Sequence, residues 1–268
     1  CPKQFYYRYV MGIHEPPKEE DIVASGQTIG NVLHHIMQQL YTPFEKKNVT
    51  SSDLRTMIDS LTEDRWQSLL SELEGDILAM QITKSYVRNI LLYDMTRAPF
   101  FYEGSECVVK RDLQVPDLGT FHFLGFIDRL DKRDGMLNII DYKTGGAELE
   151  FKDMAHVFHR SKNQDKALQT LLYCWMIRHS LPQLLTDRSE MVPHIYPVRS
   201  MAKTEAVQTM VRAKGVADFT FTPEVEREFV EGMTNLLQEI FNPEIPFVAT
   251  TEGTTRCKSC AFVGLCKG

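Results

Sequence analysis

The sequence predicts a mixed α/β protein with one central sheet, because helical and strand-like hydrophobic patterns succeed one another along a single 268-residue chain. Apolar residues recur at helical spacing in three segments of the first half: 29–40, 51–61 and 77–95. Three short β-rich segments come next: 107–115, 120–130 and 136–141. The helical pattern returns at 165–178 and precedes a further strand at 192–198. We therefore expect helices, then a β-meander, then a helix and a strand.

Local signals support this order at two places. Asp134-Gly135 separates the last two segments of the meander and is a strong signal for a tight β-hairpin. Thr222-Pro223-Glu224 combines an N-cap residue, a proline in the first helical position and an acid in the first turn. We expect a helix from there to about residue 241, followed by an irregular Cys-rich tail at about 250–268. The whole chain, 1–268, is expected to form one domain with a helical insertion at about 45–98.

Composition places the chain among ordinary globular proteins, with 43% apolar and 25% charged residues. No apolar run reaches the roughly 18 residues that a membrane-spanning helix needs, so we expect no membrane partner. The net charge of −6 gives no global attraction to nucleic acid, so any DNA site must be local. Six cysteines are too few for a disulfide scaffold and no signal peptide opens the sequence, which favours a cytoplasmic protein. Because the sequence lacks an initiator Met, we expect a fragment of a longer protein.

The residues that carry chemistry are concentrated at 125–146. Two strands joined by a tight turn each present an acid, Asp128 and Asp141, and Lys143 shares a strand face with Asp141. Two neighbouring carboxylates repel and need a cation, and oxygen ligands suit Mg²⁺ or Mn²⁺. A lysine on the same face is placed to orient a water and stabilise developing negative charge on a phosphate. The alternative is a pair of solvated strand charges, since acids and lysines are common.

Four segments resemble the motifs of PD-(D/E)XK nucleases of the RecB type. They occur in the family's order along the chain: Gly30-Asn31-Val32-Leu33-His34, Gly125-Phe126-Ile127-Asp128, Asp141-Tyr142-Lys143-Thr144-Gly145 and Gln169-Thr170-Leu171-Leu172-Tyr173. Taken singly, His34, Gln169 and Tyr173 would be read as ordinary surface or core residues of helices. The ordered set of four motifs therefore carries the resemblance.

The resemblance implies a restriction-endonuclease-like fold, in which a mixed central sheet is flanked by helices, with an N-terminal helical elaboration and a C-terminal Cys-rich tail. It also implies metal-assisted hydrolysis of DNA, with Mg²⁺ or Mn²⁺ held by four groups: His34, Asp128, Asp141 and the carbonyl of Tyr142. Lys143 is expected to position the attacking water. Several relatives hold a further acid on the preceding strand, where Glu106 is the candidate catalytic residue and Glu103 a rival.

Three cysteines crowd the tail in the pattern C-x2-C-x5-C: Cys257, Cys260 and Cys266. This spacing suits zinc or an iron–sulfur cluster, and both need four ligands. Cys1 is able to supply the fourth, because Cys1-Pro2-x-x-Phe5-Tyr6-Tyr7 resembles the segment that opens the nuclease domain of AddB-like proteins. That resemblance implies a 4Fe–4S cluster which ties the two chain ends together as a structural staple. Zinc is the alternative.

The same resemblance implies the exonuclease domain of an AddB-like helicase–nuclease that acts in double-strand-break repair. The expected partners are DNA, as a single strand or a duplex end, and a helicase region of the same or a partner chain, since no G-x4-G-K-[ST] motif is present. Gln169 and Tyr173 share a helix face and are expected to contact the DNA. Two alternatives stay open: a free-standing nuclease of the CRISPR-adaptation type, and a nuclease-fold module that binds single-stranded DNA without cutting it.

Overall fold

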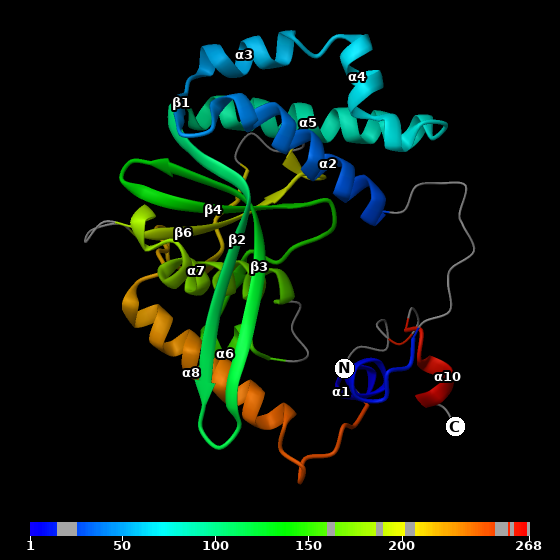
Figure 1. Cartoon of the computed structure of the whole chain (residues 1–268), viewed down its shortest axis with the longest axis vertical. Helices are drawn as coiled ribbons and strands as arrows, with labels where there is room; N and C mark the ends of the chain where they lie inside the picture. Colours follow the sequence, from blue (N-terminus) through cyan, green and yellow to red (C-terminus); the bar gives the residue numbers. More distant parts are fainter. Residues whose placement is uncertain are drawn as a thin grey trace.

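A five-stranded mixed sheet forms the centre of the protein in the computed structural model, with helices on both faces (Figure 1). The residues described are 1–14, 26–159, 164–185, 190–201, 207–249, 257 and 260–266. The strands lie in the order β1 (Lys47–Val49), β2 (Phe100–Val115), β3 (Gly119–Arg133), β4 (Met136–Lys143) and β6 (Met191–Pro197). Neighbours pair antiparallel except β4 and β6, which run parallel. The predicted mixed α/β fold is confirmed.

The helices form two layers, one on each face of the sheet (Figure 1). One layer contains α2 (Gly26–Tyr41), α3 (Ser51–Asp59), α4 (Glu63–Leu69) and α5 (Ile77–Arg97). The other contains α6 (Met154–Val157), α7 (Asp165–Ser180) and α8 (Pro223–Ile240). Short elements complete the described parts: α1 (Pro2–Phe5), η1 (Tyr6–Val10), η2 (Thr42–Phe44), η3 (Ser71–Leu73), β5 (Glu150–Phe151), η4 (Pro182–Leu184), β7 (Arg212–Ala213) and α10 (Val263–Cys266). None of the described helices is long and apolar enough to cross a membrane.

Strand β4 shows how the sheet separates two hydrophobic cores. Ile140 and Tyr142 pack into the core that includes α2 and α5, whereas Leu137 and Ile139 pack into the core that includes α7 and α8. The alternation follows from the two-residue period of a strand. Because α7 lies between β4 and β6 in the chain, the parallel pair is joined by a helical crossover, as parallel pairing requires. Asp141 therefore points to the same face of β4 as Ile139, toward the α7 layer.

Two of the predicted local signals are confirmed. Asp134 (φ 53°) and Gly135 (φ 79°) both have positive φ, as the tight turn between β3 and β4 requires. The Thr222 side chain accepts a hydrogen bond from Val225 N at 3.3 Å and caps α8. Asp134 and Gly135 adopt the backbone conformation that the turn needs, and Thr222 satisfies a backbone N–H at the start of α8.

The start of the first long strand differs from the prediction, since β2 begins at Phe100 and not at 107. The register of β2 against β3 shifts between Tyr102 and Gly104, and both Gly104 (φ 154°) and Glu106 (φ 49°) have positive φ. These irregular residues interrupt the period-two alternation by which a strand is recognised in a sequence. The strand β1 and the helix α4 were also not predicted individually from the sequence.

A buried ionic network joins α5 to β3. The Arg129 guanidinium donates to Asp94 Oδ2 at 2.6 Å and to Asp131 Oδ2 at 2.7 Å, and Arg97 donates to Asp131 Oδ1 at 3.0 Å. All four side chains are buried, and the Arg129 guanidinium carbon lies 4.5 Å from the centre of the Tyr41 ring. Burial alone raises the pKa of Asp131, but the charges of Arg97 and Arg129 outweigh it and hold that pKa below its usual range.

A chain of hydrogen bonds continues from this network to β6. Asn138 donates to Asp131 Oδ1 at 3.0 Å and accepts from His194 Nε2 at 3.0 Å. His194 Nδ1 then accepts from the Thr209 hydroxyl at 3.1 Å. Burial, followed by the charge of Arg97, lowers the pKa of His194 to about 3. The imidazole is therefore neutral, with its proton on Nε2, and the network has one consistent direction of donation.

The two terminal segments lie side by side (Figure 1). The Tyr7 hydroxyl donates to the carbonyl of Leu265 at 3.1 Å, and the Tyr7 ring centre lies 5.8 Å from that of Phe262. The ring of Phe247 stacks on Tyr6 at 5.5 Å. Most of the predicted tail at about 250–268 lies outside the described residues, but the part that is described packs against η1.

We predict that Asp94→Ala lowers the free energy of unfolding by about 3–5 kcal/mol, because it leaves the buried Arg129 charge without one of its two carboxylates. The matched control is Glu63→Ala. It removes the exposed ion-pair partner of Lys84, which lies on α5 as Asp94 does. It should cost less than about 1 kcal/mol. Urea unfolding followed by circular dichroism measures both, and equal small losses would contradict the structural role of the buried network.

Candidate functional site

Three acidic residues from three neighbouring strands lie in a row across the sheet. Glu106 on β2 is flanked by residues that pair with the two residues flanking Asp128 on β3, so these acids face one another across the two strands. Asp128 in turn lies beside Asp141, because the adjacent pair of β3 and β4 joins Arg129 to Ile140. The Tyr142 backbone N–H donates to Asp128 Oδ2 at 2.7 Å and fixes that carboxylate. The tight turn before β4 thus brings the two predicted acids together.

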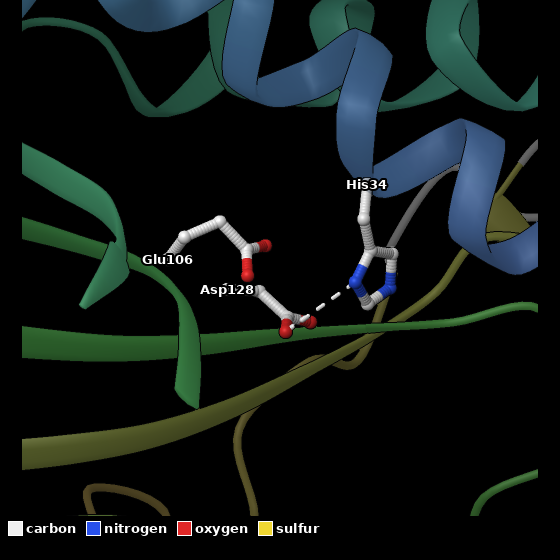
Figure 2. A group of neighbouring side chains, drawn as sticks. All are labelled: His34, Glu106 and Asp128. Carbon is white, nitrogen blue, oxygen red and sulfur yellow. Dashed lines mark ion pairs between the residues drawn. The ribbon is translucent and has the colours of Figure 1, made fainter. Parts of the chain in front are cut away.

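His34 of α2 reaches this row from the opposite layer. Its Nδ1 lies 3.5 Å from Asp128 Oδ1, and its Nε2 donates to the carbonyl oxygen of Tyr142 at 3.1 Å. His34, Glu106 and Asp128 each present a ligand atom within 4.8 Å of the others, and we call these three residues the ligand group. Figure 2 shows the imidazole and both carboxylates of the ligand group pointing toward one another. Of the described residues, no other set of three or more His, Cys, Asp or Glu side chains meets this criterion.

Asp141 and Lys143 flank the ligand group as an ion pair. The Lys143 ammonium lies 2.8 Å from Asp141 Oδ1 and 2.7 Å from Oδ2. Only the contact to Oδ1 has the geometry of a hydrogen bond, and Oδ2 is buried without such a partner in the described structure. The carboxylate of Asp141 therefore keeps one oxygen with unused acceptor capacity, as a residue that takes a cation requires.

The pKa values of both aspartates lie above their usual range. For Asp128 the main cause is burial, and the charge of Asp141 adds to it. Burial also raises the pKa of Asp141, although the Lys143 ammonium opposes the shift. Two buried carboxylates this close disfavour joint ionisation. A bound divalent cation would reverse that preference, because metal ligands bind in their deprotonated form.

The two candidate acids on β2 have different surroundings. Glu103 is buried and bound by Lys46 at 2.6 Å and by Lys132 at 2.7 Å. Burial raises its pKa, but the hydrogen bonds from the two lysines outweigh this and lower it. Glu103 is therefore neutralised within the protein, whereas Glu106 belongs to the ligand group. The left-handed backbone of Glu106, with φ 49°, is a strained conformation of the kind found at functional sites.

Helix α7 brings Gln169 and Tyr173 to the same region. Gln169 Nε2 donates to the Tyr173 hydroxyl at 2.8 Å. Burial raises the pKa of Tyr173 to about 12, and the charges of Asp141 and Asp128 add to the shift, so the hydroxyl lies close enough to sense both. Gly125 makes this packing possible, because a Cβ there would meet the Tyr173 ring at 2.9 Å. The pair thus lies on the sheet-facing side of α7, beside the acids.

The four cysteines predicted to bind a cluster come from the two ends of the chain: Cys1 from the first segment, and Cys257, Cys260 and Cys266 from the tail. Cys257 is exposed, whereas Cys1, Cys260 and Cys266 are partly buried, and Cys260 N donates to the Cys257 carbonyl at 3.4 Å. No three of these sulfur atoms lie within 4.8 Å of one another, a statement that covers the described residues only. The contacts of Tyr7 with the tail keep the two ends adjacent. The donor set of four thiolates suits a soft metal centre.

Comparison with known proteins identifies the class of protein. Residues 1–267 match the family model of the PD-(D/E)XK nuclease superfamily, and the chain belongs to that superfamily. No curated protein matches the chain. A solved structure described as "Crystal structure of SSO0001" is 15% identical, with a TM-score of 0.30, and the match covers 89% of this chain and 96% of that one. At this TM-score the likeness carries no argument, so the assignment depends on the family model.

Membership in the superfamily indicates a metal-dependent nuclease with DNA as its substrate. The observed donors fit a divalent cation, since one imidazole, two carboxylates and a backbone carbonyl converge on one region. Two of the motifs seen in the sequence, those of Asp128 and Asp141, end on adjacent strands, and the first motif supplies His34. The sequence predicts Glu106 as a catalytic residue but not as a metal ligand, because only the register of β2 against β3 reveals that it lies beside His34 and Asp128.

Two neighbouring histidines on α2 provide a direct test of the ligand group. We predict that His34→Ala weakens Mn²⁺ binding at least about tenfold, because an imidazole beside Asp128 is lost. His35→Ala should leave the affinity unchanged, since His35 is exposed and bonds only to Gln39 within the described structure. Isothermal titration calorimetry of both variants at one pH makes the comparison. Equal Mn²⁺ affinities would exclude His34 from the site.

Proposed function

We propose that the protein is a Mg²⁺- or Mn²⁺-dependent deoxyribonuclease. The observation that carries the proposal is the convergence of His34, Glu106 and Asp128 beside the Asp141–Lys143 pair. In this proposal the cation is held by five groups: His34, Glu106, Asp128, Asp141 and the carbonyl of Tyr142. A divalent cation bound there supplies Lewis acidity to the phosphate and makes a water more acidic.

The roles of the remaining groups follow from where they lie. Asp141 holds the Lys143 ammonium 2.7–2.8 Å away, at the edge of the ligand group. From there Lys143 donates a hydrogen bond to the attacking water or to a phosphate oxygen whose negative charge grows in the transition state. Gln169 and Tyr173 present an amide and a hydroxyl beside the acids, and these groups orient the DNA backbone. The main energetic cost of the site is the repulsion between its buried carboxylates. The Lys143 ammonium and the bound divalent cation offset this repulsion.

The catalytic proposal predicts that Lys143→Ala lowers the cleavage rate at least about 100-fold in Mg²⁺ or Mn²⁺, because the group that stabilises transition-state charge is lost. Asp141→Ala should be equally inactive. The matched control is Lys214→Ala, an exposed lysine beside β7, which should cleave at the wild-type rate. A gel assay on labelled linear DNA provides the readout. Wild-type cleavage by Lys143→Ala would overturn the assignment, and a wild-type chain that binds but never cuts would identify a binding module.

The finer identity proposed is that of an AddB-like iron–sulfur nuclease domain, with residues 1–268 as one domain that works with a helicase region in double-strand-break repair. The resemblance of the Cys1 segment and of the C-x2-C-x5-C tail to AddB-like proteins supports it. The contact of Tyr7 with Leu265 is consistent with it, because a cluster shared by the two ends needs them close together. In this proposal Cys1, Cys257, Cys260 and Cys266 are the ligands of a 4Fe–4S cluster that staples the chain ends.

The cluster proposal predicts about four irons per chain and broad visible absorbance in protein purified without oxygen. Cys1→Ser should lose both, because one of the four thiolates is removed. Cys107→Ser is the matched control, since Cys107 lies on β2 and its thiol donates to the Ser105 carbonyl. Visible spectroscopy and metal analysis provide the readouts. Zinc in place of iron would contradict the cluster, and a Cys1→Ser variant that keeps its iron would remove Cys1 from the ligand set.

A further inference from the structure

A groove with a volume of about 510 Å³ lies between α6 and α8, and we call it the α6–α8 groove. Phe158, at the C-terminal end of α6, packs against Phe229 of α8 with ring centres 5.4 Å apart. A Cβ on Gly232 would clash with the Phe158 ring, so the glycine lets the two helices approach closely. The α6–α8 groove lies beside this contact and is therefore bounded by packed, fixed elements.

The lining of the α6–α8 groove is acidic. Among the described residues that line it there are four acids and no Lys, Arg or His; the acids are Asp153, Glu228, Glu231 and Glu239. Glu231 follows Glu228 by three residues and Glu239 follows it by eleven, which places all three on one face of α8. Phe229 and Met233 on the other side of the helix are buried in the core. The face of α8 that borders the groove thus carries a row of carboxylates.

The protein neutralises other acids of α8 but not those at the start of this row. Glu226 forms ion pairs with Arg111 at 2.8 Å and with Arg178 at 2.5 Å. Glu228 and Glu231 are exposed, and no described Lys, Arg or His lies within ion-pair distance of either. The α6–α8 groove therefore attracts cations and repels the phosphates of a nucleic acid.

Apolar side chains form the floor of the α6–α8 groove and extend into a second cavity. Met154, Phe158 and Leu236 line the groove. Phe158 and Leu236 also line an adjoining cavity of about 280 Å³, whose apolar walls include Phe5 beside Cys1 and Ile240 of α8. We call this second cavity the anchor pocket. Its volume has room for one large apolar side chain, such as that of a Leu, Phe or Trp residue.

The combination of an acidic rim and an apolar floor is complementary to a basic amphipathic helix. On such a helix, Lys or Arg residues three or four positions apart repeat at the same spacing as the acids of α8. A helix that lies in a groove binds through a few apolar anchors, and opposite charges at the rim set its orientation. A metal ion is a poorer match, because among the described residues these acids do not bring three ligand atoms within 4.8 Å of one another.

We propose that the α6–α8 groove docks a basic amphipathic helix of a partner protein. The cations of this helix lie against Glu228 and Glu231, and one large apolar side chain fills the anchor pocket. The proposal does not depend on the nuclease function proposed above, because no residue of the ligand group and neither member of the Asp141–Lys143 pair lines the groove or the pocket.

The experiment selects a phage-displayed library of random peptides on the immobilised wild-type chain. The enriched peptides should have a net positive charge and a large apolar residue. The most enriched peptide is then synthesised with a fluorescent label, and its affinity is measured by fluorescence anisotropy. Glu228→Lys combined with Glu231→Lys should weaken binding at least about tenfold, because like charges then face each other.

The matched control is Glu72→Lys combined with Glu74→Lys. It makes the same change of charge at two exposed acids of the η3 turn, in the other helical layer, and should bind the peptide like the wild type. Circular dichroism melting checks that both double variants keep the fold. In the peptide, alanine in place of the large apolar residue should also weaken binding at least about tenfold, because the anchor pocket is then left empty.

Four results would overturn the proposal. The first is a selection that enriches no basic peptide, and the second is equal peptide affinity for the two double variants. The third is a basic peptide that binds equally well without its apolar residue, since that result shows only attraction to an acidic protein. The fourth is a wild-type dimer that only the groove variant dissociates, because a second copy would then be the occupant.

DNA cleavage measured in parallel keeps the docking proposal separate from the nuclease proposal. Both double variants should cut linear DNA at the same rate, since neither alters the candidate site. A chain that cuts DNA but fails the peptide test loses only the docking groove. A chain that never cuts DNA but binds the basic peptide through Glu228 and Glu231 loses only the nuclease function.

Discussion

The geometry of the site depends on the burial of Arg129. Its guanidinium is held by Asp94 of α5 and by Asp131 of its own strand, with Tyr41 and Phe100 on its faces. Successive side chains of a strand point to opposite faces. Fixing Arg129 on one face of β3 therefore fixes the direction of its sequence neighbour Asp128 on the other. The layer of α2 and α5 thus sets the position of an acid that lies beyond its own core.

The site itself works against the stability of the protein. Glu106, Asp128 and Asp141 come together on adjacent strands, and burial raises the pKa values of both aspartates. Within the described structure Lys143 is the cation that pairs with Asp141. The ionic network on the other side of β3 has the opposite character, since its carboxylates and guanidinium groups match in number. Strand β3 therefore has a charge-balanced ionic network on one face and a cluster with excess negative charge on the other.

Sequence patterns predicted those features that depend on local geometry. The turn at Asp134-Gly135 and the cap at Thr222 are short-range, and the adjacency of Asp128 and Asp141 follows from the turn. The early start of β2 could not be predicted, because the positive φ of Gly104 and Glu106 breaks the alternation. Burial of the charged network was also hidden, since Asp94, Arg97, Arg129 and Asp131 read as surface residues until their partners are known. The motif resemblance supplied His34, whose 94-residue separation from Asp128 no local pattern spans.

The adjacency of the two termini has a mechanical consequence. Tyr7 contacts Leu265 and Phe262, and Phe247 stacks on Tyr6, so the first and last described segments share one small aromatic cluster. Tension applied through both ends of the chain would act on that cluster first and peel it apart one contact at a time. The sheet that carries the acids would feel load only after the terminal cluster had opened. The contacts between the terminal segments would therefore break before the interior of the protein is strained.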